Sequence, residues 1–381
     1  MAQLINPEDI EQVRSVARID DIVSAYVTLK PAGSGTLKGL CPFHDEKSPS
    51  FQVTPARGLF YCFGCGKGGD TVTFVEEINN FSFREAIEYL ASRYGVTLRL
   101  TDQGGASDGV SRMRLFEMNQ AASDFFVGQL SKPGAQAGRD LLTGRGFSAE
   151  MAAHFQVGFA PQGGRELVKH LRGLGFREDE MHEGGLMRSG GWDYFQGRLI
   201  WPIRDSANQI RGFGARRLFD DDRMPAKYLN TPDTPIYKKS EVLYGLDLAR
   251  TAIGVRSEVL VVEGYTDVMA CHVAGITWAV ATCGTAFGDG HARVVQRLMG
   301  DNTSAGKVIF CFDGDAAGQK AALRAFQEDS RFTAQTYAVV VPDGLDPCEL
   351  RQQRGDQAVR DLVDSRIPLY RFVMANVVKR Y

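Results

Sequence analysis

The sequence predicts an α+β protein with more than one domain, and three observations support this prediction. A Cys/His set near the N-terminus has the spacing of a zinc ribbon. Three short apolar runs between residues 259 and 312, separated by gaps of helix length, are typical of a parallel α/β sheet. A stretch rich in Gly, Ser and Asp lies between these two parts. With 381 residues, 44% of them hydrophobic, the chain can bury the cores of two or three domains.

Two Cys/His knuckles, Cys41-Pro-Phe-His44 and Cys62-Phe-Gly-Cys65, are separated by seventeen residues. Each knuckle can give two soft ligands to one tetrahedral ion, and the sequence around them has the composition of short strands. We therefore expect one zinc ion bound by these four side chains. Because four nitrogen and sulfur ligands leave no open coordination position, the zinc should be structural rather than catalytic.

The predicted zinc-ribbon domain covers residues 1–100, and residues 71–94 carry the apolar periodicity of two helices that pack on the ribbon. Aromatic and basic residues alternate along the ribbon. They can bind nucleic acid by stacking on bases and attracting phosphates, or the aromatic rings can form the core of a small domain. These residues are Phe51, Phe60, Tyr61, Phe63, Lys47, Arg57 and Lys67. Residues 101–112 are the expected flexible linker.

Basic residues concentrate in the region 113–240, which follows the linker. Between Arg211 and Lys239 there are seven basic and four acidic residues, so the local net charge is +3. Arg198 and Arg204 flank an apolar run that is a predicted strand, which adds two cations nearby. A charge run of this kind either binds phosphates or is a solvated face.

Carboxylates follow two of the predicted parallel strands. Glu263 comes after the run 259–262, and Asp313 and Asp315 come after the run 308–312. Ligands bind beyond the carboxyl ends of parallel strands, and residues i and i+2 of an extended segment point the same way. Three acids in one place repel one another unless a divalent cation neutralises them, and oxygen ligands favour Mg²⁺ or Mn²⁺ over zinc. The alternative is a helix cap and an ordinary Asp-Gly turn.

A third acidic cluster repeats this arrangement near the C-terminus. Asp346 follows the apolar run 339–341 and is the expected metal partner there. We expect residues 241–365 to hold the parallel sheet, and residues 361–381 have the periodicity of a helix.

The segments VVEGYTDVMA and FDGDAAG resemble the Toprim fold, which bacterial DnaG-type primases share with type IA and type II topoisomerases and some nucleases. By this resemblance Glu263 and Asp267 match the first Toprim motif, and Asp313 and Asp315 match the second. The resemblance implies two or more Mg²⁺ or Mn²⁺ ions held by these acids together with Asp346. The expected catalytic residues are Glu263, Asp313 and Asp315, and Glu263 is either a metal ligand or an acid/base group.

The chain departs from the family pattern at one acid. Asp346 matches the first acid of a DPD-like motif, but Cys348 stands where the second acid is usual. The adjacent Glu349 is a candidate substitute.

Two other parts of the chain resemble DnaG-type primases. The segments CPFHDEKSPSF and FYCFGCGKGGD are similar to the primase zinc domain, which implies contact with the DNA template. The segments GRLIWPIRD, GFGARR and KYLNTPDTPIYKK are similar to the polymerase domain, which implies binding of template backbone or nucleotide phosphates. The residues expected to do so are Arg198, Arg204, Lys227, Asn230 and Lys239.

The resemblance implies a DNA primase, which synthesises short RNA primers from NTPs on single-stranded DNA by two-metal nucleotidyl transfer. Two alternatives remain: a Toprim topoisomerase or nuclease, and a non-catalytic zinc-ribbon module that binds DNA. Relatives carry a further helical part, of which residues 366–381 would be the start, and a domain that binds the replicative helicase. We expect that the helicase-binding domain is missing here.

Composition limits the cellular context. The net charge is −2, so any surface that binds nucleic acid must be local. There is no apolar run of 18 residues and no basic stretch followed by an apolar core at the N-terminus, so we expect a cytoplasmic protein without membrane contact. Seven cysteines in such a compartment indicate one metal site and buried thiols rather than disulfides.

Overall fold

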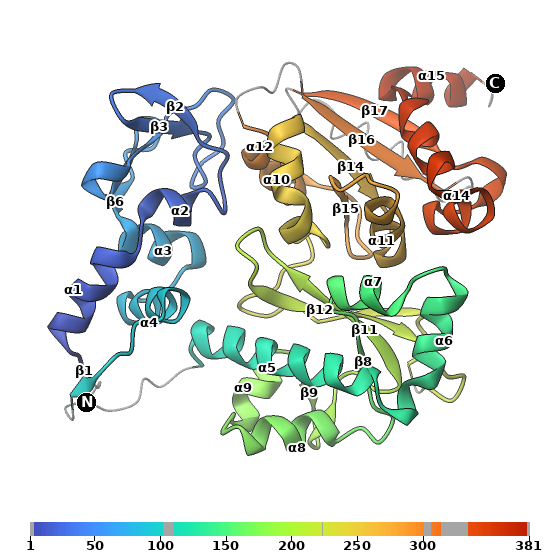
Figure 1. Ribbon diagram of the computed structural model, residues 1–381, viewed down its shortest axis with the longest axis horizontal. Coiled ribbons are helices and arrows are strands. Elements are labelled where there is room, and N and C mark those ends of the chain that lie inside the picture. The colour runs from blue at the N-terminus through green and yellow to red at the C-terminus, as the bar shows by residue number, and fades with distance from the viewer. Residues whose placement is uncertain (1–3, 102–109, 223, 301–305, 314–333, 379–381) are drawn as a thin grey trace. The chain divides into compact units, whose positions relative to one another are not determined.

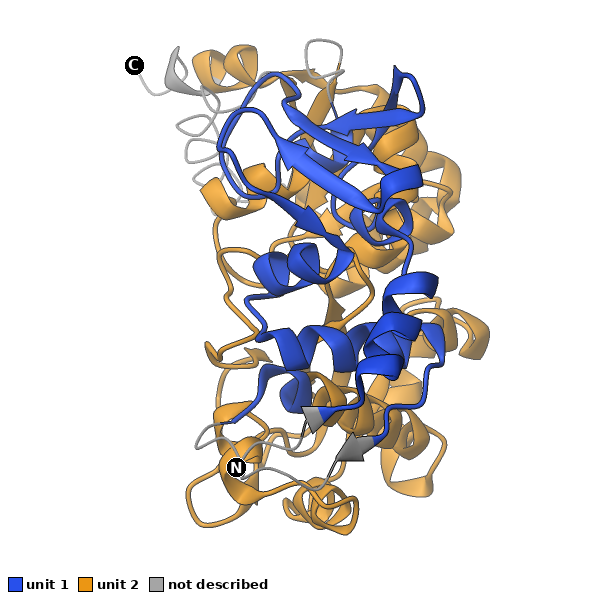
Figure 2. Cartoon of the chain, turned by 90° about the vertical axis from the view of Figure 1, so that its left-hand side faces the viewer, with its two compact units in different colours: residues 1–115, 296–301 blue, residues 116–295, 302–381 orange. Residues whose placement is uncertain are grey.

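The computed structural model describes residues 4–101, 110–222, 224–300, 306–313 and 334–378. By its internal contacts the chain divides into two compact units, Met1–Leu115 with Gln296–Asp301 and Phe116–Val295 with Asn302–Tyr381 (Figure 2). Residues 102–109 of the predicted linker lie outside the described residues.

Unit 1 is built on a five-stranded antiparallel sheet with the order β2-β3-β4-β5-β6 (Figure 1). Strands β1 and β7 pair separately. Its strands are β1 Leu4–Ile5, β2 Lys30–Gly33, β3 Thr36–Gly39, β4 Phe51–Thr54, β5 Leu59–Cys62, β6 Gly68–Asp70 and β7 Leu100–Thr101. Its helices are α1 Pro7–Val16, α2 Ile19–Val23, α3 Thr71–Asn79 and α4 Phe83–Tyr94.

Aromatic rings form the core of unit 1. Phe51 of β4 and Phe60 of β5 stack with ring centroids 5.4 Å apart, and Phe74 of α3 meets Phe60 edge-on at 5.5 Å. The two predicted helices are confirmed and have well-defined starts. Asp70 accepts a hydrogen bond from the backbone of α3, and Ser82 begins α4 with a capping box.

The first part of unit 2 is an antiparallel sheet with the order β13-β12-β11-β8, accompanied, among the described residues, by one long and four short helices. Every residue of β11 is buried. The helices of this part are α5 Arg112–Leu130, α6 Gln136–Gly144, α7 Ala149–His154, α8 Glu166–Gly173 and α9 Glu178–Glu183. Its strands are β8 Gly158–Ala160, β9 Met187–Arg188, β10 Trp192–Asp193, β11 Arg198–Arg204, β12 Ile210–Arg217 and β13 Tyr228–Asn230.

The second part of unit 2 confirms the predicted parallel sheet, which has the order β15-β14-β16-β17-β18 (Figure 1). All pairs are parallel except β17 with the edge strand β18. Its strands are β14 Glu258–Val262, β15 Ala279–Ala281, β16 Lys307–Phe312, β17 Gln335–Val340 and β18 Ile367–Pro368. Its helices are α10 Leu246–Arg256, α11 Tyr265–Val273, α12 Asp289–Met299, α14 Pro347–Asp364 and α15 Leu369–Val378.

One prediction for the C-terminal segment was wrong. Residues 361–381 do not form one helix, because α14 ends at Asp364 and the short strand β18 separates it from α15. The backbone of β18 pairs with β17, and this long-range pairing overrides the local helical periodicity.

The two sheets of unit 2 share one hydrophobic core. Trp201 of β11 stacks on Tyr265 of α11 with ring centroids 5.3 Å apart and planes at 10°. Gly214 of β12 makes room for the Tyr265 ring, because a Cβ there would lie 2.2 Å from the phenolic oxygen. This packing brings the basic region next to the parallel sheet.

Candidate metal centres and nucleic-acid interface

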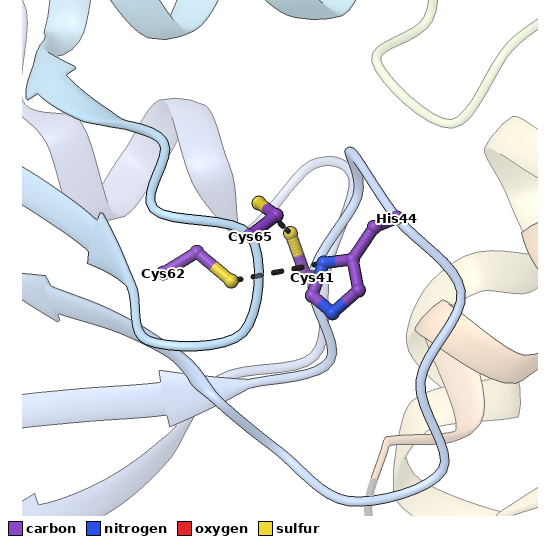
Figure 3. Close-up of side chains that lie close together, drawn as sticks. All are labelled: Cys41, His44, Cys62 and Cys65. Atoms are coloured by element: carbon purple, nitrogen blue, oxygen red, sulfur yellow. Dashed lines mark hydrogen bonds between the residues drawn. The ribbon is translucent and has the colours of Figure 1, made fainter.

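The four predicted zinc ligands come together in unit 1 (Figure 3), and their ligand atoms all lie within 4.8 Å of one another. Cys41 Sγ lies 3.9 Å from Cys65 Sγ, and Cys62 Sγ lies 3.7 Å from His44 Nδ1. The loop between β3 and β4 supplies Cys41 and His44, and the hairpin between β5 and β6 supplies the other two.

This donor set fits a zinc ion. Three thiols and one imidazole are typical ligands of structural zinc sites. Burial raises the pKa of the Cys41 thiol well above its usual range, so a thiolate there needs a cation beside it. Both the chemistry and the spacing of the side chains therefore support a structural zinc site.

The structure divides the aromatic residues of the ribbon into two groups. Phe51 and Phe60 are buried in the core, as the structural alternative predicts. Tyr61 and Phe63 are 47% and 66% exposed and lie edge to face, with ring centroids 5.0 Å apart. Lys67 lies on the same part of the ribbon, over the Phe43 ring and paired with Glu77. Two rings are thus available for stacking on bases.

Two of the predicted acids lie at the carboxyl edge of the parallel sheet. Because Val261 of β14 pairs with Phe310 of β16, Glu263 and Asp313 leave the sheet at the same edge. Glu263 is exposed and lines a cavity of about 310 Å³ formed by the ends of β14, β15 and β16. Asp313 is half-buried. Asp315 lies outside the described residues.

Asp267 is the most deeply buried acid near this edge. Its Oδ2 accepts a hydrogen bond of 2.9 Å from the backbone of Gly264, whereas its buried Oδ1 has no hydrogen-bond partner among the described residues. Burial, together with Asp346 and Asp313 nearby, raises the pKa of Asp267 to about 8. A buried carboxylate with an unsatisfied oxygen and two acidic neighbours fits a divalent cation, because the ion would offset the repulsion among the three carboxylates.

Asp346 begins α14 and is partly committed to its cap. Its Oδ1 accepts a hydrogen bond of 2.7 Å from the backbone N–H of Glu349. In return, the Glu349 carboxylate accepts a hydrogen bond from the backbone N–H of Asp346. One oxygen of each carboxylate takes part in this cap, and Glu349 stays a candidate substitute for the missing acid. Cys348 is buried, and burial raises the pKa of its thiol to about 12.

Two arginines that the sequence analysis did not single out also lie at this site. Arg145 Nη1 is 3.5 Å from Asp346 Oδ2, and Arg216 lies over the Tyr228 ring at 5.8 Å. The buried Nη1 of each guanidinium has no hydrogen-bond partner within the described parts of the chain. Arg216 belongs to the segment GFGARR, which resembles the primase polymerase domain, whereas Arg145 belongs to no segment that the sequence analysis named, and only the fold identifies it.

Arg198 and Arg204 are both enclosed by the protein and have internal hydrogen-bond partners. Arg198 is 1% exposed, and its guanidinium donates to Asp222 at 2.6 Å and to two backbone carbonyls of residues 224 and 226. Arg204 is also buried, and it donates to the carbonyl of Asn208 and to the side chain of Gln156. These contacts favour a structural role, in which the two arginines hold loops of unit 2, and phosphate binding by them stays a prediction.

The other three predicted residues are Lys227, Asn230 and Lys239. The side-chain amide of Asn230 donates to the carbonyl of Cys283 and accepts a hydrogen bond of 2.7 Å from Tyr265, so it joins the two sheets. Lys227 and Lys239 are exposed. Lys227 Nζ lies 5.9 Å from the centre of the Tyr228 ring, whose other cationic neighbour is Arg216.

Three family models match successive parts of the chain. They describe a CHC2 zinc finger over residues 5–105, the N-terminal domain of the DNA primase catalytic core over residues 125–250, and a Toprim domain over residues 257–339. The structure is similar to that of the zinc-binding and RNA polymerase domains of Aquifex aeolicus primase. The TM-score is 0.65 at 31% sequence identity, and the match covers 97% of this chain and 88% of that one.

The chain belongs to the DnaG-type DNA primase family. The RNA polymerase domain of Mycobacterium tuberculosis primase matches with a TM-score of 0.68 at 50% identity, covering 70% of this chain and 88% of that one. The DNA primase of Streptomyces coelicolor is 54% identical over 388 residues, covering all of this chain and 60% of the relative. This chain thus spans about 60% of the length of such primases.

Solved primase structures with DNA include the RNA polymerase domain of the Mycobacterium tuberculosis protein with double-stranded DNA and a DnaG catalytic domain with single-stranded DNA. Family membership confirms the resemblance drawn from the sequence, including the zinc ribbon and the Toprim fold. Within the described ranges, no helix is long and apolar enough to cross a membrane.

Proposed function

We propose that this chain synthesises short RNA primers from NTPs on a single-stranded DNA template. The observation that carries the proposal is the meeting of acids and cations at one edge of unit 2. Arg145 Nη1 lies 3.5 Å from Asp346 Oδ2, and Tyr228, whose ring lies under the Arg216 guanidinium, also senses the charge of Asp267. Nucleotidyl transfer needs both charges, because phosphates and metal ions must be held together.

In this proposal five carboxylates hold the divalent ions: Glu263, Asp267, Asp313, Asp315 and Asp346. When bound, Mg²⁺ or Mn²⁺ would neutralise the charge that develops on the attacking and leaving oxygens. The unsatisfied Oδ1 of Asp267 is the atom best suited to an ion, since no protein donor competes for it among the residues described. Glu263 is exposed and can serve either as a ligand or as an acid/base group.

The cationic side chains would hold the phosphates. Lys227 and Lys239 are exposed and can reach template or nucleotide, while Arg145 and Arg216 have buried N–H groups that an anion could satisfy. Asn230 would act indirectly, by fixing β13 to the parallel sheet. The exposed Tyr61 and Phe63 of unit 1 are the candidates for stacking on template bases.

The test is incorporation of labelled ribonucleotides into RNA on single-stranded DNA, with and without Mg²⁺. Asp313→Asn should lower primer yield at least about 100-fold, because each metal-binding acid is needed for charge stabilisation. Asp364→Asn is the control, since Asp364 is 82% exposed and lies in the same unit. Equal primer yield from the parent and Asp313→Asn would exclude the assignment of the metal site.

Two other outcomes would favour the alternatives. Mg²⁺-dependent relaxation or cleavage of supercoiled DNA without RNA synthesis would indicate a topoisomerase or nuclease. Zinc-dependent DNA binding without nucleotide turnover would indicate a binding module.

A further inference from the structure

The carboxylate of Glu46 contacts two of the zinc ligands of unit 1, although Glu46 belongs to neither knuckle. Its side chain is only 9% exposed. Oε1 accepts two hydrogen bonds, one of 2.6 Å from the backbone N–H of Cys41 and one of 3.1 Å from the backbone N–H of Ser50. Oε2 accepts from the Ser50 hydroxyl and lies 3.4 Å from His44 Nε2. One carboxylate therefore contacts two zinc ligands and the residue that follows them.

Ser50 extends this arrangement to the second knuckle. Its Oγ lies 3.2 Å from Cys62 Sγ as well as being hydrogen-bonded to Glu46. The space around the pair is closed, because a Cβ at Gly64 would lie 2.6 Å from His44 Nε2 and 2.8 Å from Ser50 Oγ. Glu46 and Ser50 thus link the loop that carries Cys41 and His44 to the hairpin that carries Cys62.

We propose that Glu46 and Ser50 are positioning residues that orient the zinc ligands. Glu46 faces Nε2 of His44, which leaves Nδ1, the nitrogen facing Cys62 Sγ, to bind the ion. A hydrogen bond from Nε2–H to a carboxylate selects this tautomer, fixes the ring and strengthens the metal-bound nitrogen as a donor. Ser50 donates its one hydroxyl hydrogen to Glu46 Oε2, so it holds this carboxylate in place, and its Oγ packs against Cys62 Sγ.

The division of contacts between the two oxygens of Glu46 allows a sharp experiment. In Glu46→Gln the amide oxygen can keep both backbone hydrogen bonds that Oε1 accepts, whereas the amide NH₂ in place of Oε2 removes the acceptor for His44 and for the Ser50 hydroxyl. The variant should therefore keep the backbone contacts of the loop and weaken the side-chain contacts that hold His44. Ser50→Ala removes the contact with Cys62, and Glu11→Gln on exposed α1 is a control that loses the same charge.

The measurement is made on the whole chain. Zinc affinity is determined by competition with a chromophoric chelator, and the coordination geometry is followed by the thiolate-to-cobalt bands of the Co²⁺-substituted protein, which report only on the cysteine site. The parent is measured first, so that absence of a metal site is distinguished from failure of this proposal. We expect Glu46→Gln to raise the zinc Kd 10- to 100-fold and Ser50→Ala to raise it by less, with the cobalt bands unchanged.

Two results would overturn the proposal. If Glu46→Gln binds zinc within twofold of Glu11→Gln, the carboxylate only stabilises the loop. If Glu46→Gln changes the pattern of cobalt bands, Glu46 is itself a ligand rather than a positioning residue. Should Glu46→Gln fail to fold, Ser50→Ala decides by the same criteria.

Discussion

At the scale of single residues, burial separates the cations of unit 2 into two kinds. Arg198 is enclosed by the sheet and donates to Asp222, whose side chain is also largely buried. Arg198 also donates a hydrogen bond to the carbonyl of Met224. Lys227 lies only three residues further along the chain, but it is exposed. The first kind contributes to folding, and the second is free to meet a polyanion.

We expect Arg198→Met to lower the free energy of unfolding by about 3 kcal/mol, because it leaves the Asp222 carboxylate buried without its guanidinium. Urea unfolding followed by circular dichroism measures this change. Lys227→Met is the matched control and should alter stability by less than about 0.5 kcal/mol. It should instead weaken binding of single-stranded DNA. The slope of the logarithm of the binding constant against the logarithm of the salt concentration should become shallower by about one, the value for one lost phosphate contact. A stable Arg198→Met variant with weakened DNA binding would reverse this assignment.

At the scale of elements, the segment between β13 and α10 is anchored to the parallel sheet by its backbone. Tyr244 and Ala281 exchange two hydrogen bonds of 2.8 and 3.1 Å. His291 of α12 is buried, and its Nε2 lies 3.0 Å from the carbonyl oxygen of Lys239. Its Nδ1 accepts a hydrogen bond from the backbone N–H of Gly288. The proposed phosphate-binding Lys239 is therefore fixed by a neutral histidine.

This histidine predicts a dependence of stability on pH. Burial lowers the pKa of His291, opposed by the carbonyls of Lys239 and Val242 and by Glu241. Because the folded-state pKa lies below the unfolded one, the stabilisation is complete above about pH 6.5 and is lost as the pH falls from there towards the folded-state pKa.

The free energy of unfolding, measured in urea at pH 7.5, 6.5 and 5.5, should fall with acid, by at most about 1.4 kcal/mol per pH unit for this one group. His291→Gln should flatten the fall, since glutamine does not titrate and can still donate to Lys239. His182→Gln changes an exposed histidine and should keep the slope of the parent. Equal slopes for all three proteins would contradict the prediction.

The contact between β12 and α11 gives a second prediction at this scale. Gly214→Ala should destabilise unit 2 by about 1–3 kcal/mol, because the new methyl group meets the Tyr265 ring and displaces its hydrogen bond with Asn230. Gly128→Ala in α5 is the control: a Cβ there meets nothing within 4 Å, so it should be neutral or stabilise by up to about 1 kcal/mol. Thermal unfolding compares the two, and a Gly214→Ala variant as stable as the parent would show that the ring can move.

At the scale of the whole molecule, the two units have different sources of stability. Unit 2 holds a core shared by its two sheets, which includes residues from β11, α11, β14 and α14. Unit 1 is smaller, and its strands are only two to four residues long. Short strands around a metal site depend on the ion, because binding free energy becomes folding free energy.

Removal of zinc by a chelator should therefore affect the units unequally. We expect faster amide hydrogen exchange in β3 to β6 and no change in β14 and β16. Hydrogen exchange with mass spectrometry checks this segment by segment, and re-addition of zinc should restore protection. Equal loss of protection in both units would show that zinc supports more than the ribbon.

The sequence by itself determined the parts of this protein that depend on neighbours along the chain. The zinc ligands are recognisable because each pair lies within four residues of one knuckle. Glu263 and Asp313 could be placed at one edge because parallel strands align their carboxyl ends whatever surrounds them. The families were identifiable for the same reason, since their motifs are short segments.

The tertiary structure alone decided which polar side chains face the site and which are enclosed. Arg198 and Lys227 are both cations in one basic stretch, and only the packing of β11 shows that the first is interior. Arg145 lies beside Asp346, which is distant in the sequence, only because the fold places the two together. Burial and pairing depend on groups that folding brings together, and for this reason no local pattern in the sequence could specify them.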